Sequence, residues 1–162
     1  MESRISRILS DLGVIVAEPL WVSTFHSFCA DVIRENPSEF SINPSAEPLS
    51  DLSKFKLISQ LLKLGSYPIL RPLNAPDHYV KSILKSIQNL KREGVDPDKF
   101  EDLIDFDEKE LDLDALSPAK AKIELKNIAK NRELLTLYRL YNEHLSSNGQ
   151  FDFEDMINFV RL

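Results

Sequence analysis

The sequence predicts a mainly α-helical protein that contains one short β-strand. Apolar residues recur at intervals of three and four through most of the 162-residue chain, as they do along one face of an α-helix. Most of these apolar stripes are bounded by glycine, proline or a capping side chain, which are the usual ends of helices. One segment, 20–25, is instead a short apolar run rich in strand-forming residues.

The N-terminal part of the chain predicts a helix, the strand and a second helix. Residues 3–12 form a short amphipathic stripe that ends at Gly13. Pro19 blocks further helix, so the apolar run 20–25 is expected to be extended. A helical pattern over 26–34 follows at once. The strand is therefore expected to lead directly into a helix.

After a proline-containing loop at 36–50, every remaining element is expected to be helical. One apolar face runs over 52–62 and ends at Gly65. A second stretch with several prolines must be irregular. Asp77 is then expected to cap a helix that extends to Glu93.

The longest helix is predicted to begin at 117–118 and to end at Gly149, because proline favours the first helical turn. Its apolar face includes Ile123, and a last helix begins at about 152–153. The periodicity of these stripes also predicts a set of largely buried side chains. They are Leu52, Phe55, Ile58, Ile83, Ile87, Tyr138 and Tyr141.

Between Glu101 and Asp114 the chain is strongly acidic. Eight acids stand there against one base, Lys109, and the stretch is expected to be a solvated loop. The net charge of the chain, −6, argues at first against nucleic-acid binding. Outside the acidic stretch, however, 19 bases accompany 18 acids, which leaves room for local basic surfaces.

The bulk composition indicates one soluble, cytoplasmic domain. With 43% hydrophobic residues in 162, the chain is long enough to bury a core. It has no apolar run of membrane-spanning length and no signal-peptide core, so no membrane contact is expected. Cys29 is the single cysteine, which excludes an internal disulfide and a thiolate metal site.

The positions of the glycines argue against a nucleotide site in this chain. A phosphate-binding loop of the form G-x-x-x-x-G-K-[ST] needs two glycines five residues apart, and a dinucleotide-binding loop needs G-x-G-x-x-G. The four glycines stand at 13, 65, 94 and 149, and no pair fits either spacing. No cofactor is therefore expected here.

The other reactive side chains also have structural explanations. The three histidines lie far apart and lack the spacing of a metal motif. Cys29 follows His26 by three residues, but it lies on an apolar helix face and is expected to be a buried thiol. Asp152, Glu154 and Asp155 stand at a helix start, where acids cap exposed N–H groups. No catalytic residue and no metal site are predicted.

Two of the predicted helices carry basic stripes. On the helix over 77–93, Lys81, Lys85 and Arg92 share a side with Gln88, largely opposite the apolar stripe. The longest helix carries lysines at intervals of four, namely Lys122, Lys126 and Lys130. Such stripes are typical of surfaces that contact phosphate, but ordinary solvated faces carry them too.

Three motifs resemble a family of DNA helicases. Residues 22–30 read VSTFHSFCA, with Val-Ile-Arg at 32–34 behind them. Residues 87–94 read IQNLKREG, and YRLY at 138–141 is followed by QFDFEDMI at 150–157. In this order and at these spacings the motifs resemble the UvrD, Rep and PcrA helicases, in the region between the ATP-binding loop and the motif that holds magnesium.

The resemblance implies a helicase fragment with three parts. Residues 1–36 would belong to a partial RecA-like motor domain, residues 37–150 would form the helical 1B insertion subdomain, and residues 151–162 would form the return helix towards the motor domain. The parent would be an ATP-dependent 3′–5′ DNA helicase of unwinding, repair or replication, with its ATP and Mg²⁺ held outside this chain. The fragment by itself would then be inactive.

The resemblance also implies DNA contacts. Thr24 and His26, at the end of the expected strand, would touch single-stranded DNA. The candidates for contact with a fork are Lys81, Lys85, Lys91 and Arg92. Thr24 is nearly as well suited to cap the helix that follows it. Phe25 and Trp21 are expected to belong to a core.

Two alternatives remain open. One is a helical module that binds a protein partner through the acidic stretch. The other is the equivalent region of a recombination helicase–nuclease. In the helicase interpretation the partners are single-stranded and forked DNA together with the remaining motor domains of the parent.

Overall fold

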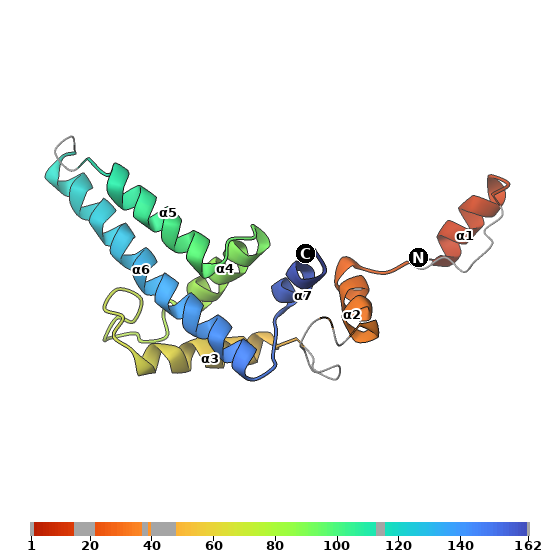
Figure 1. Cartoon of the computed structure of the whole chain (residues 1–162), viewed down its shortest axis with the longest axis horizontal. Helices are drawn as coiled ribbons and strands as arrows, with labels where there is room; N and C mark the ends of the chain where they lie inside the picture. Colours follow the sequence, from red (N-terminus) through yellow and green to blue (C-terminus); the bar gives the residue numbers. More distant parts are fainter. Residues whose placement is uncertain (1, 15–21, 37–38, 40–47, 113–115, 162) are drawn as a thin grey trace.

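A computed structural model describes residues 2–14, 22–36, 39, 48–112 and 116–161 of the chain, and this part is mainly helical. The helices are α1 (Glu2–Asp11), α2 (Phe25–Glu35), α3 (Asp51–Leu64), α4 (Val80–Arg92), α5 (Pro97–Glu110), α6 (Pro118–Ser147) and α7 (Phe153–Arg161). In Figure 1, α3, α4, α5 and α6 form a four-helix group at one end, α2 and α7 lie beside it, and α1 stands apart at the other end. The prediction of a mainly α-helical chain is confirmed.

The predicted strand over 20–25 is not found in the part of the chain that the structure describes. Phe25 is already the first residue of α2, and 22–24 lead into the helix without strand pairing. Leu20 and Trp21 lie outside the described residues. A strand is held by hydrogen bonds to a neighbouring strand, and the described residues supply no such neighbour. Strand-forming side chains were therefore not sufficient to make a strand.

The main core lies where α3, α4, α5 and α6 pack together. Of the seven side chains predicted to be buried, five are confirmed: Ile58, Ile83, Ile87, Tyr138 and Tyr141. Phe55 is partly buried against the same core. The prediction for Leu52 is wrong, since this side chain is 64% exposed. Six residues separate it from Ile58, which rotates it about 120° around the helix from the buried side.

The acidic stretch is also different from the prediction, because most of it forms α5 rather than a loop. Asp96 caps the helix by accepting a hydrogen bond from the Lys99 N–H at 2.8 Å. Phe100 and Ile104, four residues apart, are buried against α6. The surrounding charged residues made this short apolar pair difficult to recognise in the sequence. Its helical spacing was nevertheless present, with Phe100 just before the acidic stretch and Ile104 within it.

Two arginines of α6 neutralise part of the acidic charge on α5. Arg132 pairs with Asp105 and Glu108, each at 2.6 Å. Arg139 pairs with Asp98 at 3.0 Å and Glu101 at 2.7 Å. These contacts join the two helices along their length, in addition to the apolar contacts below them.

The ends of α4 and α6 show which capping predictions hold. Gly94 and Gly149 close these helices with φ of 69° and 59°, a conformation that glycine adopts without strain. Asp77 does not cap α4, which begins at Val80; its carboxylate accepts a hydrogen bond from Ser59 Oγ at 2.6 Å. Ile123, predicted to lie on an apolar face, is 57% exposed because α6 extends beyond the core there.

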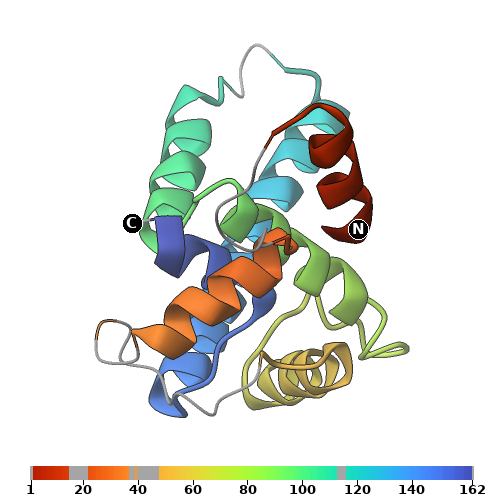
Figure 2. The ribbon, with the colours of Figure 1, turned by 90° about the vertical axis from the view of Figure 1, so that its right-hand side faces the viewer.

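A second, smaller core joins α2 and α7, which come from distant parts of the sequence. It consists of Cys29, Ile33, Phe151 and Met156. The two helices lie side by side in Figure 2. Next to them, the Leu49 N–H donates to the Phe151 carbonyl at 2.9 Å. The chain therefore enters and leaves the four-helix group through two adjacent points, which we call the neck (Leu49 and Phe151).

Candidate nucleic-acid interface

Thr24 and His26 lie at the exposed start of α2. The hydroxyl of Thr24 accepts a hydrogen bond from the Ser27 N–H at 3.2 Å and shares a second with the Ser27 hydroxyl at 3.0 Å. Thr24 is therefore the N-cap of α2, which is one of the two roles predicted for it. His26 places its ring edge-on to Phe153 of α7, with the centroids 5.6 Å apart. Both side chains remain accessible to a ligand.

Phe25 does not belong to a core as predicted, since its side chain is 71% exposed. It directly follows the capping residue Thr24, in the first turn of α2. Trp21 lies outside the described residues. The surface at the start of α2 thus presents an aromatic ring beside a hydroxyl and an imidazole.

Lys81 and Lys85 lie on the exposed side of α4. Neither forms an ion pair or a hydrogen bond with any residue that the structure describes. Arg92 continues the same side but donates to the Glu154 carboxylate at 3.0 Å. Of these three bases, only the two lysines therefore carry uncompensated charge.

Lys91 has a different environment from the one expected for a phosphate contact. Its side chain is 3% exposed, and its ammonium lies 2.7 Å from both Asp152 Oδ2 and Asp155 Oδ1. The Tyr141 hydroxyl donates to the same Asp152 oxygen at 3.1 Å. This buried cluster, which we call the Lys91 network, joins α4 and α6 to the start of α7. We therefore remove Lys91 from the DNA-binding candidates.

Burial and charge act in opposite directions on the carboxylates of the Lys91 network. Burial opposes ionisation of Asp152, yet the ammonium of Lys91 holds the pKa of this carboxyl below its usual value. Burial raises the pKa of Asp155, helped by the negative charge of Asp152. Burial also raises the pKa of Tyr141, which keeps its hydroxyl protonated as a donor. The ammonium is thus shared by one firmly ionised carboxylate and one that ionises less readily.

The same two aspartates cap α7. The Asp152 N–H donates to Asp155 Oδ2 at 3.1 Å, and the Asp155 N–H donates to Asp152 Oδ1 at 2.9 Å. The capping predicted for this acidic cluster is confirmed. The ion pairs of this cluster were not predicted, because Lys91 lies 61 residues from Asp152 in the sequence. Two aspartates that cap a helix form the same sequence pattern whether or not a cation binds them. The one signal in the sequence was that Lys91 lies on the apolar side of its predicted helix.

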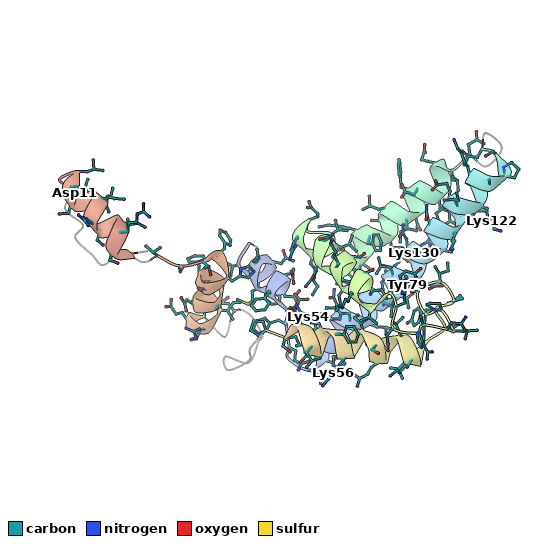
Figure 3. The ribbon with its side chains drawn as sticks, turned by 180° about the vertical axis from the view of Figure 1, so that it is seen from behind. Asp11, Lys54, Lys56, Tyr79, Lys122 and Lys130 are labelled. Atoms are coloured by element: carbon teal, nitrogen blue, oxygen red, sulfur yellow. The ribbon has the colours of Figure 1, made fainter. Side chains whose placement is uncertain are left out.

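The second basic stripe lies on the N-terminal half of α6, where Lys122, Lys126 and Lys130 are exposed. The ammonium of Lys130 lies 5.7 Å from the ring centroid of Tyr79. Figure 3 shows Lys122 nearer than Lys130 to the start of α6, and Tyr79 beside Lys130. This half of the helix therefore offers cations next to an aromatic ring.

The described part of the chain gives little support for other chemistry. No three side chains of the metal-binding types come together in it. Cys29 is fully buried, as predicted, and burial raises the pKa of its thiol. No described helix is long and apolar enough to span a membrane.

Comparison with known proteins identifies the family. A family model described as the UvrD/REP helicase N-terminal domain matches residues 1–161. The chain is 26% identical over 158 residues to the ATP-dependent DNA helicase PcrA of Staphylococcus aureus, an alignment that covers 97% of this chain and 17% of that protein. It is 29% identical over 100 residues to the helicase of the same name from Bacillus subtilis, covering 62% of the chain and 12% of the relative. Since the model matches nearly every residue, the chain belongs to the UvrD/REP helicase N-terminal domain family.

Proposed function

We propose that this chain is the 1B insertion subdomain of an ATP-dependent 3′–5′ DNA helicase together with flanking parts of the first motor domain. The observation that supports this assignment is the neck. Leu49 and Phe151 are hydrogen-bonded neighbours, while the 101 residues between them form a core separate from that of α2 and α7. A segment that leaves one unit and returns to it at the same place is the topology expected of an inserted subdomain.

In this proposal residues 1–36 and 151–162 belong to the motor domain and residues 37–150 form the insertion. The Lys91 network would hold the insertion at a fixed angle to α7, because it connects α4 and α6 to the first turn of that helix. A rigid connection would let movement of the motor domain reach the insertion. The relatives that this chain matches are several times longer than it is, so unwinding itself is proposed for a larger parent.

ATP and Mg²⁺ are proposed for the parent and not for these residues. All four glycines end helices here: Gly13 follows α1, and Gly65, Gly94 and Gly149 follow α3, α4 and α6. None is left to form the backbone cradle that binds phosphates. A phosphate-binding loop encoded upstream and an aspartate–glutamate motif encoded downstream in the parent gene would support this division.

DNA contact is proposed at two places, the start of α2 and the exposed side of α4. Thr24 and His26 at the start of α2 would meet single-stranded DNA. Lys81 and Lys85 on α4 would meet the phosphates of a fork, since they are exposed and unpaired among the described residues. Arg92 is a secondary candidate because Glu154 already holds it.

The test is an anisotropy titration of a labelled DNA fork with the chain at low salt. Replacing Lys81 and Lys85 together by glutamine should weaken binding about tenfold and lower the slope of log affinity against log salt by roughly 2, about one unit per phosphate contact. The matched control is Lys56→Gln with Lys63→Gln, two exposed lysines on α3. Equal loss from both pairs would mean diffuse attraction without a defined surface.

The second candidate function is a protein-interaction module. Absence of fork binding at every salt concentration would favour it over the DNA-binding proposal. If the chain is instead the equivalent region of a recombination helicase–nuclease, the expected DNA binding is the same as in the first proposal. A nuclease domain encoded in the same gene would distinguish it.

A further inference from the structure

The outer side of α5 exposes two large apolar side chains. Leu103 is 52% exposed and Phe106 is 62% exposed. They stand three residues apart, so they share one side of the helix, and Glu110 continues that side one turn later. Figure 1 shows α5 at the edge of the four-helix group, packed against α6. The side that carries Leu103 and Phe106 is therefore open.

The acids of α5 divide into two groups with different partners. Four of them bind the arginines of α6, as described above. The other three, Asp102, Asp107 and Glu110, are exposed and have no ion pair or hydrogen bond with any described residue. Helical spacing places these three around Leu103 and Phe106. We call these five residues the acidic–apolar face.

The lysines of α5 do not neutralise the acidic–apolar face. Lys99, at its start, directs its ammonium to the Gly94 carbonyl at 3.2 Å and to Asp96 at 3.6 Å. Lys109 is exposed at the margin of this face and forms no ion pair with any described residue. Uncompensated negative charge therefore surrounds an apolar centre. Phosphate is repelled from such a surface, so this face is not suited to DNA.

We propose that the acidic–apolar face binds a basic amphipathic helix of a partner protein. Apolar side chains of such a helix would cover Leu103 and Phe106, and its flanking lysines or arginines would pair with the three free carboxylates. A helix is the fitting occupant because Leu103, Phe106 and Glu110 run along the α5 axis, and their ridge packs into the groove of a second helix. The proposal is independent of the proposed DNA contacts.

The probe is a fluorescein-labelled 18-residue peptide helix with leucines at i, i+3, i+4 and i+7 and lysines elsewhere. One comparison peptide carries glutamate in place of each lysine. Another keeps the composition but loses the helical spacing of the leucines. The first peptide should bind the chain at low salt, and both comparison peptides should bind at least about tenfold more weakly, because charge and apolar spacing are both required.

Variants of the chain then locate the binding. Leu103→Ser with Phe106→Ser should weaken the lysine peptide at least tenfold, and so should Asp102→Asn, Asp107→Asn and Glu110→Gln together. The matched control is Leu52→Ser with Leu64→Ser, which removes from α3 two apolar side chains that are more exposed than Leu103 and Phe106. All of these positions are on the surface, and far-UV circular dichroism should confirm that each variant is folded.

Three results would overturn the proposal. The first is undiminished peptide binding by the Leu103→Ser, Phe106→Ser variant. The second is undiminished peptide binding by the Asp102→Asn, Asp107→Asn, Glu110→Gln variant, which would mean that the lysines are attracted to another part of the chain. The third is a concentration-dependent dimer in sedimentation that the same variant abolishes, because a second copy of the chain would then be the occupant of the face.

Discussion

Lys91 and Asp152 lie 2.7 Å apart in the interior, with 3% and 1% of their side chains exposed. One belongs to α4 of the four-helix group and the other immediately precedes α7. A buried ion pair is costly to break from one side, because the remaining charge has neither water nor a partner. The pair therefore makes the junction between the two cores sensitive to single substitutions.

The first prediction concerns the lysine of this pair. Lys91→Met should destabilise the chain by about 3–5 kcal/mol, because the buried carboxylate of Asp152 and the partly buried carboxylate of Asp155 lose their cation. Urea unfolding followed by circular dichroism measures the loss. Lys85→Met on the exposed side of the same helix is the control and should change stability by less than about 0.5 kcal/mol. Similar values for both variants would mean that the Lys91 network does not hold the junction.

The second prediction concerns acid. The pKa of Asp152 is lowered in the folded chain, so its contribution to stability is present above the unfolded value of about 3.9 and is lost as pH falls through the lower folded value. Asp152→Asn should lower stability at neutral pH and make the stability curve flatter below about pH 4. Unfolding midpoints measured at a series of pH values test this. An acid limb as steep as that of the unmodified chain would contradict the assignment to Asp152.

The third prediction concerns the capping of α2 by Thr24. Thr24→Ala should cost about 0.5–2 kcal/mol of stability, because the Ser27 N–H loses its acceptor, whereas Thr24→Ser should keep most of it. The control is Ser23→Ala, at an exposed neighbouring position. Thermal unfolding measures all three. If Ser23→Ala cost as much as Thr24→Ala, the hydroxyl of Thr24 would not be the effective cap.

The fourth prediction uses Cys29, a residue of the smaller core, to report on the packing of that core. Cys29 is fully buried and burial raises the pKa of its thiol, so a thiol-specific reagent should not react with the native chain at neutral pH. Reaction should follow unfolding of the α2–α7 pair. In the Lys91→Met variant the thiol should become reactive at lower urea, since α7 loses the ion pair of Asp155 with α4 and keeps only weaker contacts such as the one between Arg92 and Glu154. Fast reaction in the unmodified native chain would contradict the packing of this core.

The sequence by itself determined the helices with clear periodicity, several of their caps and the family. Ile83 and Ile87 recur at helical spacing, and their burial was predicted from that spacing. Gly94 and Gly149 end helices for local steric reasons. The motifs around Thr24 and Phe151 depend on residue identity alone, so their resemblance to UvrD-like helicases could be found without coordinates.

Only the tertiary structure decided which charged residues face solvent. Lys81 and Lys91 look alike in sequence, yet one is exposed and the other is buried between Asp152 and Asp155. The acids of α5 likewise divide into paired and free groups only through the arginines of α6. Helix formation depends on neighbours three and four residues away, which a sequence displays directly. In these examples the environment of a charge depends on partners that stand 24 to 64 positions away in the sequence, and only packing brings them together.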